Sequence, residues 1–170
     1  MKQNQKKFIA VIGYRRSGKS TIIQSLTGCK NHSFIGEVLD RELGVTIFVH
    51  APSPQENPKT GEREFAAHLR KTATNRSALG VVIAIQPTLA RRRLLMDKML
   101  TLAFQQGFDC FAFILEHPYE GKRIGNVENI KQRILASAPN AKLYSLDGRR
   151  FAVLNAESIR ALSRITDRTS

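Results

Sequence analysis

The sequence predicts an α/β fold in which a mostly parallel sheet carries helices on both faces. Short apolar runs alternate with segments of helical periodicity along the whole chain, which is the pattern of strands joined by crossover helices. The runs are almost continuously apolar, as in strands that are buried on both faces. Hydrophobic residues make up 42% of the 170 residues, enough for a buried core, and no linker divides the chain, so one domain is expected over residues 1–170.

A strand, a helix and a pair of strands are expected in the first fifty residues. The apolar run at 7–13 is the first strand, and the helix after it places three apolar residues on one face before Gly28 ends it. Residues 33–50 then contain two strand segments joined by a turn at 41–44.

The rest of the chain continues the alternation. Prolines make 51–61 a loop, and the helix that follows has Phe65 and Leu69 four residues apart. The clearest helix covers residues 89–107, where apolar residues recur at helical spacing and Gly107 ends the segment. The remaining expected elements are helices at 62–74, 126–139 and 155–166 and strands at 79–87, 108–118 and 141–146.

The charge favours a polyanionic partner. Lysine and arginine number 27 against 14 acids, a net charge of +13, which suits nucleic acid, a nucleotide or an acidic membrane surface. A basic surface without such a partner is the other interpretation.

Nothing in the sequence predicts a membrane span or a secretory leader. No apolar run is long enough to cross a bilayer, and the chain opens with "MKQNQKK". The two cysteines, Cys29 and Cys110, lack metal or redox spacing, and the histidines lack paired ligand spacing. A cytoplasmic location is therefore expected.

The strongest functional pattern is G-x-x-x-x-G-K-S, which runs from Gly13 to Ser20 between the first strand and the first helix. Its two glycines let the backbone wrap closely, so that main-chain N–H groups and the positive end of the helix face phosphate oxygens. Lys19 is expected to reach the β- and γ-phosphates, and the Ser20 hydroxyl to ligate Mg²⁺. A glycine-rich turn that carries a chance lysine is the competing interpretation.

Several neighbours share this expected role. The residues predicted to contact the nucleotide along the segment are Gly13, Tyr14, Arg15, Arg16, Ser17, Gly18, Lys19, Ser20 and Thr21. Arg15 and Arg16 either add charge near the phosphates or face solvent, and solvent is favoured.

The first 30 residues, which end in "GKSTIIQSLTGC", resemble the start of a Ras-like or Era-like small GTPase. The chain length suits one such domain, and the order of the expected elements fits throughout. The resemblance implies a three-layer P-loop NTPase sandwich with one antiparallel strand in a mostly parallel sheet. It also implies that the cofactors are Mg²⁺ and GTP or ATP.

Later motifs of that family are altered in this chain. Where the family has D-x-x-G, the chain has "HAPS", so that His50 replaces an aspartate that supports Mg²⁺. Where the family has N-K-x-D, the chain has "EHPY", with His117 and Tyr119 at the lysine and aspartate positions, and "SLDGRR" stands in place of S-A-K. Guanine specificity is therefore not predicted, and His117 and Tyr119 are instead expected to stack on a base of any kind.

Hydrolysis needs a group that orients water and positive charge on the transferring phosphoryl group. Lys19 supplies the charge. Pro54 occupies the family's place for a water-orienting glutamine, which makes Gln55, one residue further, the catalytic candidate; a loop glutamine that faces solvent is the favoured alternative. Gln86 ends a strand where other P-loop enzymes carry an acid, and it is neutral.

Clusters of basic residues are the candidate polyanion surfaces. Arg91–Arg93 open the helix expected at 89–107, at the end where the helix dipole disfavours cations, which favours a binding role. The basic pairs at 122–123 and 149–150 lie in loops after strands, the edge at which such sheets bind nucleotides. Each set is either a nucleic-acid contact or a solvated face.

The last helix is expected to carry basic residues on its outer face and apolar residues on its inner face. The basic stripe consists of Arg160, Arg164 and Arg168, which fall four residues apart. The expected inner residues are Ile159, Leu162 and Ile165.

These observations favour nucleoside-triphosphate binding and slow Mg²⁺-dependent hydrolysis by a switch or scaffold protein. A nucleotide or nucleic-acid kinase is the first alternative, because such enzymes share the motif, although no arginine-rich lid helix is evident. A non-enzymatic module that binds nucleic acid or a protein partner is the second, supported by the charge of +13 and the missing acids.

Overall fold

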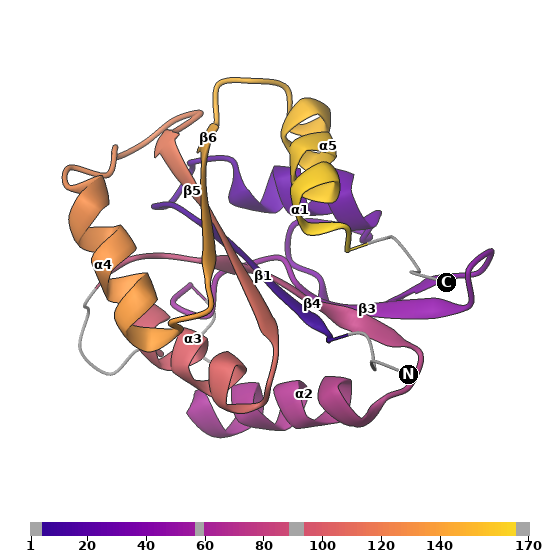
Figure 1. The fold of residues 1–170 in the computed structure, drawn as a ribbon. Helices are drawn as coiled ribbons and strands as arrows, with labels where there is room; N and C mark the ends of the chain where they lie inside the picture. The colour runs from indigo at the N-terminus through magenta and orange to yellow at the C-terminus, as the bar shows by residue number, and fades with distance from the viewer. Residues whose placement is uncertain (1–4, 57–59, 89–93, 166–170) are drawn as a thin grey trace.

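The computed structural model describes residues 5–56, 60–88 and 94–165. Within them, six strands form one sheet and five helices pack against it (Figure 1). The strands are β1 (Lys7–Ile12), β2 (Ile35–Asp40), β3 (Val45–His50), β4 (Ala78–Ile85), β5 (Asp109–His117) and β6 (Lys142–Asp147). The helices are α1 (Lys19–Thr27), α2 (Glu62–Thr74), α3 (Met96–Gln105), α4 (Val127–Ser137) and α5 (Ala152–Ser163). None of these helices is long and apolar enough to cross a membrane.

The sheet is mostly parallel and has one antiparallel pair. Its strand order is β2-β3-β4-β1-β5-β6, and β2 pairs antiparallel with β3 through the turn predicted at 41–44. The other neighbouring strands are parallel; Ile9 of β1, for example, lies opposite Val82 of β4 and Phe111 of β5. The predicted α/β class, with a mostly parallel sheet and one antiparallel strand, is confirmed.

Helices cover both faces of the sheet, which makes three layers. Successive side chains of β1 point to opposite faces, so Phe8 lies in a core with α2, α3 and α4, whereas Ile9 lies in a core with α1 and α5. Figure 1 shows the same division of the helices between the two faces. All side chains from Phe8 to Ile12 are fully buried, which is why β1 reads as a continuous apolar run rather than an alternating one.

The third helix is shorter than the sequence predicts. It begins at Met96 and not at residue 89, because Leu95 has an extended backbone with φ −80° and ψ 149°. A negatively charged side chain stabilises the N-terminal turn of a helix, and Asp97 lies in the first turn of α3. A run of arginines at that end would be unfavourable, because it opposes the helix dipole. Arg91–Arg93 therefore do not open this helix, and the polyanion contact predicted for them lies outside the described residues.

The last helix begins earlier than the sequence predicts, at Ala152 rather than at residue 155. Asn155 is buried, and its side-chain amide donates a hydrogen bond of 2.9 Å to the Asp147 carbonyl at the end of β6. This bond ties the first turn of α5 to the sheet across a short loop. Residues 148–149 form the turn in this loop.

The prediction of which α5 residues face the core and which face outward is partly wrong. Leu162 is 43% exposed and does not lie in the core. The Arg160 guanidinium donates hydrogen bonds to the carbonyls of Ser25 and Leu26 near the end of α1, so it fills positions that a helix end leaves unpaired. Arg168 lies outside the described residues. The stripe predicted as a polyanion contact therefore includes a residue that joins two helices.

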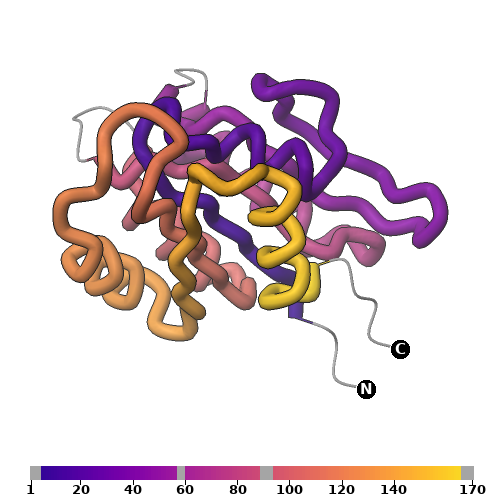
Figure 2. Tube along the Cα trace, turned by 90° about the horizontal axis from the view of Figure 1, so that it is seen from above, coloured from indigo at the N-terminus to yellow at the C-terminus, as the bar shows by residue number. Residues whose placement is uncertain are grey.

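The loops after the parallel strands meet at one edge of the sheet, the carboxyl edge of its strands. They lead from β1 to α1, from β3 to α2, from β4 to α3, from β5 to α4 and from β6 to α5. In Figure 2, which views the chain from above, the loops after β1, β5 and β6 lie near one another. This edge is where sheets of this kind hold ligands.

Candidate functional site

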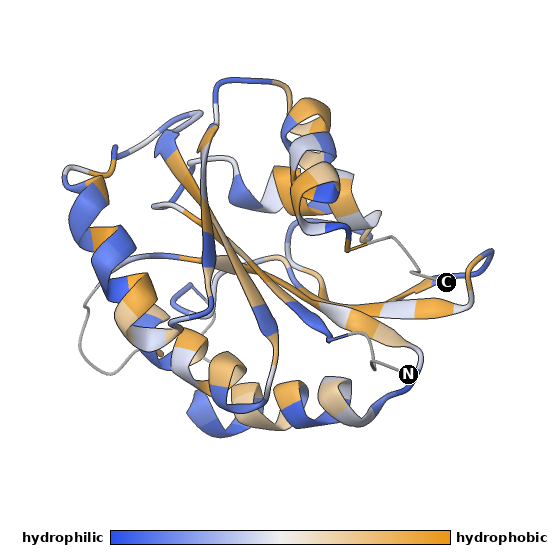
Figure 3. Cartoon of the chain, viewed as in Figure 1, coloured by the Kyte–Doolittle hydropathy of each residue, from blue (hydrophilic) through white to orange (hydrophobic). Residues whose placement is uncertain are grey.

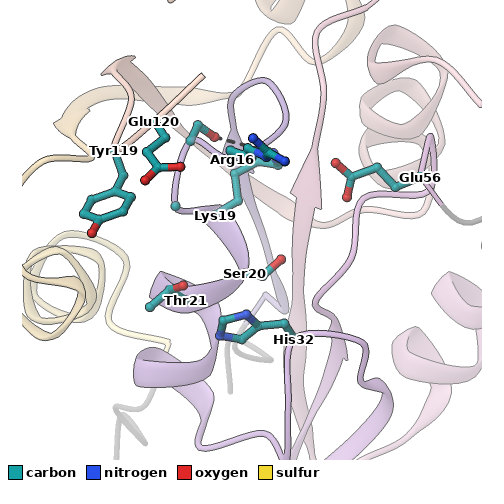
Figure 4. A pocket seen from close by; sticks show the side chains of 10 residues that line it. Arg16, Lys19, Ser20, Thr21, His32, Glu56, Tyr119 and Glu120 are labelled. Atoms are coloured by element: carbon teal, nitrogen blue, oxygen red, sulfur yellow. Dashed lines mark hydrogen bonds between the residues drawn. The ribbon is translucent and has the colours of Figure 1, made fainter. Parts of the chain in front are cut away.

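A pocket of about 250 Å³ opens at the carboxyl edge, beside the loop between β1 and α1 (Figure 4). The loops after β1, α1, β3 and β5 and the start of α1 supply its lining residues: Arg16, Ser17, Gly18, Lys19, Ser20, Thr21, His32, Glu56, Tyr119 and Glu120. The predicted contact residues from Arg16 to Thr21 are thus brought together with Tyr119. The predicted residues that do not line it are Gly13, Tyr14, Arg15, Gln55 and His117.

The β1–α1 loop is tightly wrapped. Arg16 and Gly18 have left-handed backbones, with φ 65° and 102°, and a Cβ on Gly13 would meet Ser17 Oγ at 2.5 Å. The backbone N–H groups of residues 18–21 have no hydrogen-bond acceptor within the described residues. These donors lie at the positive end of the α1 dipole, which is an arrangement that binds anions.

Lys19 is a buried cation inside this loop. Its Nζ donates a hydrogen bond of 2.6 Å to the Tyr14 carbonyl and lies 3.5 Å from Ser17 Oγ, and the residue is only 4% exposed. Burial lowers the pKa of Lys19 to about 8, and the Glu56 carboxylate partly offsets that effect. Since both hydrogen-bonding partners of this ammonium are neutral, an anion in the pocket would stabilise its charged form.

Ser20 is placed to offer an oxygen to a cation. Its hydroxyl donates a hydrogen bond of 2.8 Å to the Ala51 carbonyl, so the lone pairs of Oγ are left for another group. The Glu56 carboxylate lines the same pocket. Among the described residues there is no group of three or more His, Cys, Asp or Glu side chains that could hold a metal ion. A single hydroxyl is compatible with Mg²⁺ in a phosphate pocket, because this ion keeps several waters and takes few protein ligands.

His50, at the position expected for an aspartate, is a buried neutral imidazole. Its Nδ1 lies 2.5 Å from the Pro52 carbonyl, which only accepts, so Nδ1 carries the proton. Nε2 then accepts from the Thr60 hydroxyl at 3.1 Å. Burial lowers the pKa of His50 to about 4. Both ring nitrogens are occupied, so His50 does not take the role of a carboxylate beside Mg²⁺.

Gln55 is held away from solvent by the end of β4. Its carboxamide donates to the Gln86 carbonyl at 3.0 Å and accepts from the Gln86 N–H at 3.3 Å, and the residue is 6% exposed. The alternative that Gln55 faces solvent is therefore wrong, and its catalytic role stays a prediction. The next residue, Glu56, is exposed, lines the pocket and accepts a hydrogen bond of 2.6 Å from Gln86 Nε2.

The loops after β5 and β6 pack directly against the β1–α1 loop. The N–H groups of Tyr119 and Glu120 donate to the carbonyls of Ser17 and Arg16, at 3.1 and 3.0 Å. A Cβ on Gly148 would meet the Ser17 carbonyl oxygen at 2.6 Å, so only glycine fits there. The backbones of the loops after β1, β5 and β6 thus contact one another.

Three lining residues were not predicted from the sequence: His32, Glu56 and Glu120. Glu56 is the first acid after β3, and Glu120 directly follows Tyr119. Both lie in loops that follow strands. Because such loops converge at the carboxyl edge of the sheet, the sequence could have indicated that these two acids lie near the pocket. His32 lies in the loop after α1, and no sequence pattern around it indicates that this loop reaches the pocket.

No protein-family model, curated protein or solved structure matches this chain.

Proposed function

We propose that the protein binds the phosphate chain of a nucleoside triphosphate, GTP or ATP, with Mg²⁺ in this pocket and hydrolyses it slowly, as a switch or scaffold. The observation that carries the proposal is the buried Lys19 ammonium beside the unpaired N–H groups at the start of α1. A strand, a wrapped loop and a helix present both to the same pocket, which supports a phosphate ligand over a chance glycine turn.

The size of the pocket supports a phosphate ligand more than a fully enclosed nucleotide. Its volume is about 250 Å³, below the roughly 300–1,000 Å³ of pockets that bury most of a drug-sized ligand. The phosphate chain is therefore the enclosed part, and the base lies toward Tyr119 at the rim. Tyr119 is 66% exposed, so its ring is available for stacking.

Mg²⁺ would be held by the Ser20 hydroxyl oxygen and by phosphate oxygens of the nucleotide. When bound, the ion neutralises charge that develops on the phosphate oxygens. Lys19 adds a second positive charge from inside the loop, and the N–H groups of residues 18–21 donate to phosphate oxygens.

Glu56 is the side chain best placed to orient the attacking water. It reaches the pocket from the loop after β3, and Gln86 holds its carboxylate by a hydrogen bond of 2.6 Å. A carboxylate accepts a proton or a hydrogen bond from water, whereas Pro54 does neither and His50 is already hydrogen-bonded on both sides. Hydrolysis is expected to be slow because the Glu56 carboxylate alone orients the attacking water.

The proposal is tested by titrating the protein calorimetrically with GTP, ATP, GDP and ADP, with and without Mg²⁺. Lys19→Met removes the charge but keeps a buried apolar stem, so the variant should fold normally and lose triphosphate binding by 100-fold or more, on the order expected for loss of a charge-assisted contact in an anion site. Lys71→Met, at an exposed position on α2, is the matched control. Unchanged triphosphate affinity in folded Lys19→Met would overturn the proposal.

Phosphate release separates hydrolysis from the kinase alternative. The proposal expects inorganic phosphate without an added acceptor, whereas a kinase transfers the phosphoryl group to a nucleoside monophosphate or an oligonucleotide end. Transfer that outpaces release would replace hydrolysis with the kinase function while leaving the phosphate site intact.

A further inference from the structure

Two exposed aromatic rings lie on the loops after β5 and β6, and Tyr119 also lines the pocket. Tyr119, after β5, is 66% exposed, and Phe151, at the N-cap of α5, is 82% exposed. Val153 and Leu154 are also exposed, and Figure 3 shows the hydrophilic loop after β6 becoming hydrophobic where α5 begins. Apolar side chains that gather at one place on a surface mark a binding site more often than isolated ones do.

The two loops that carry these rings are joined through their backbones. The Gly148 N–H donates a hydrogen bond of 2.6 Å to the His117 carbonyl, and a Cβ on Gly148 would meet the Tyr119 nitrogen at 2.9 Å. Phe151 follows Gly148 by three residues, which limits their Cα separation to about 11 Å. The backbones at Tyr119 and Phe151 are thus separated by a distance that a few nucleotides span.

Basic residues are frequent in the loop that packs against these two and in the two loops that carry the rings. The exposed cations of the loops after β1, β5 and β6 that form no ion pair within the described residues are Arg15, Arg16, Lys122, Arg123 and Arg150. Arg149 is paired with Asp147, and Lys122 Nζ lies 4.9 Å from the centroid of the Tyr14 ring. The unpaired cations outnumber the acids of these loops, which attracts a polyanion.

We propose that this surface, formed by the loops after β1, β5 and β6, binds single-stranded nucleic acid. Bases stack on Tyr119 and Phe151, and the phosphates lie against the unpaired cations. A single strand offers unpaired bases and phosphates together, whereas a duplex hides its base faces and uses the cations alone. An anionic membrane also uses the cations without the rings. The inference does not depend on triphosphate binding in the pocket.

The first experiment measures the binding of fluorescein-labelled oligothymidylate by anisotropy, without nucleotide or Mg²⁺. The single strand should bind more tightly than a duplex of equal length. Phe151→Ala should weaken single-strand binding roughly 5- to 150-fold, the contribution of one stacked base, and leave duplex binding unchanged. Phe104→Ala, which removes a 40% exposed ring near the end of α3 at the opposite edge of the sheet, is the matched control and should bind like the wild type.

The second experiment repeats the titration over a range of salt concentrations. The logarithm of affinity should fall linearly with the logarithm of salt, and Arg150→Ala should make the slope shallower by about 0.7, the value for one phosphate contact on a single strand. Phe151→Ala should keep the wild-type slope. Arg76→Ala, in the exposed loop before β4, is the matched control for charge.

Four results would overturn the proposal. They are a duplex bound as tightly as the single strand, equal losses from Phe151→Ala and Phe104→Ala, no oligonucleotide binding at low salt, and binding to phosphatidylserine vesicles alone. The last result would assign the cations to a lipid surface.

Discussion

The side-chain amide of Gln86, just after β4, donates a hydrogen bond of 2.6 Å to the carboxylate of Glu56, in the loop after β3. Figure 4 shows Glu56 on the other side of the pocket from Tyr119 and Glu120. Gln86 stands where other P-loop enzymes carry an acid, and under the proposed function the Glu56 carboxylate from the neighbouring loop takes that role.

Glu56→Gln should slow triphosphate hydrolysis by about 100-fold, the lower part of the range for loss of a proton-transfer group. The new amide keeps an oxygen that accepts from Gln86, so the variant removes the negative charge and little else. Wild-type turnover should itself lie near or below ~10⁻³ s⁻¹, the order of an unassisted small GTPase. Single-turnover phosphate release measures both rates, and Glu120→Gln, also at the pocket, is the matched control. Full activity in Glu56→Gln would return the role to Gln55.

Gln86→Ala should slow hydrolysis by about tenfold through Glu56, because loss of an orienting partner typically costs 10- to 100-fold. Triphosphate affinity should change little, since Gln86 does not line the pocket. Combining Gln86→Ala with Glu56→Gln should slow the reaction no further than Glu56→Gln alone. Additive losses would show that Gln86 acts independently of Glu56.

Raising the pH from 8 to 10 should weaken triphosphate binding and stabilise the free protein, both through Lys19. The pKa of Lys19 is about 8 in the folded chain against 10.5 for an ordinary lysine, so in this window the unfolded chain binds a proton that the folded chain has lost. The free energy of unfolding therefore rises with pH, while affinity falls by up to tenfold per pH unit. Denaturant melts and calorimetry measure the two effects, and Lys19→Met should lack both pH dependences.

Acidification from pH 6.5 to pH 4 should destabilise the protein through His50. The pKa of His50 is about 4 when folded against 6.5 for an ordinary histidine, so the unfolded chain takes up a proton that the folded chain excludes. The free energy of unfolding should fall with pH less steeply in His50→Gln than in the wild type. His32→Gln, at an exposed histidine, controls for loss of the residue type. Equal slopes in wild type and His50→Gln would show that the ring is accessible to solvent protons.

Discrimination between GTP and ATP should be weak, below the ~10⁴-fold of sites built to hydrogen-bond their ligand. Tyr119 presents a ring face that does not distinguish the bases, so Tyr119→Ala should weaken both nucleotides alike. A competition titration measures the ratio. Strict GTP preference would contradict the prediction, and its loss in Glu120→Ala would identify the Glu120 carboxylate as a guanine acceptor.

Local patterns in the sequence were enough to predict most of the fold. The run at 7–13, the glycine that ends α1 and the turn at 41–44 each act over a few residues, and each lies where it was expected. The start of α3 was misplaced because apolar residues such as Leu94 and Leu95 fit the helical pattern although they precede the helix. Hydrophobic periodicity does not show whether a residue packs from a helix or from the segment leading into it.

The site was predictable only where its parts are adjacent in sequence. The stretch from Arg16 to Thr21 lines the pocket as a unit, so its motif was sufficient. Glu56 is hydrogen-bonded by Gln86, which follows a different strand, and that contact arises only when β3 and β4 pair in register. Gln55 and Glu56 are adjacent in the chain, and the fold alone decides which of them reaches the pocket.

Gly148 packs against the backbone of both proposed sites. It abuts the Ser17 carbonyl on one side and the Tyr119 nitrogen on the other, and Tyr119 in turn donates to Ser17. A triphosphate that moves Ser17 therefore displaces the loops that carry Tyr119 and Phe151. The coupling is reciprocal by thermodynamic necessity: the factor by which a single strand changes triphosphate affinity equals the factor by which triphosphate changes the affinity for that strand. A side chain at position 148 would push against both loops, so its replacement should change the affinity for both ligands together.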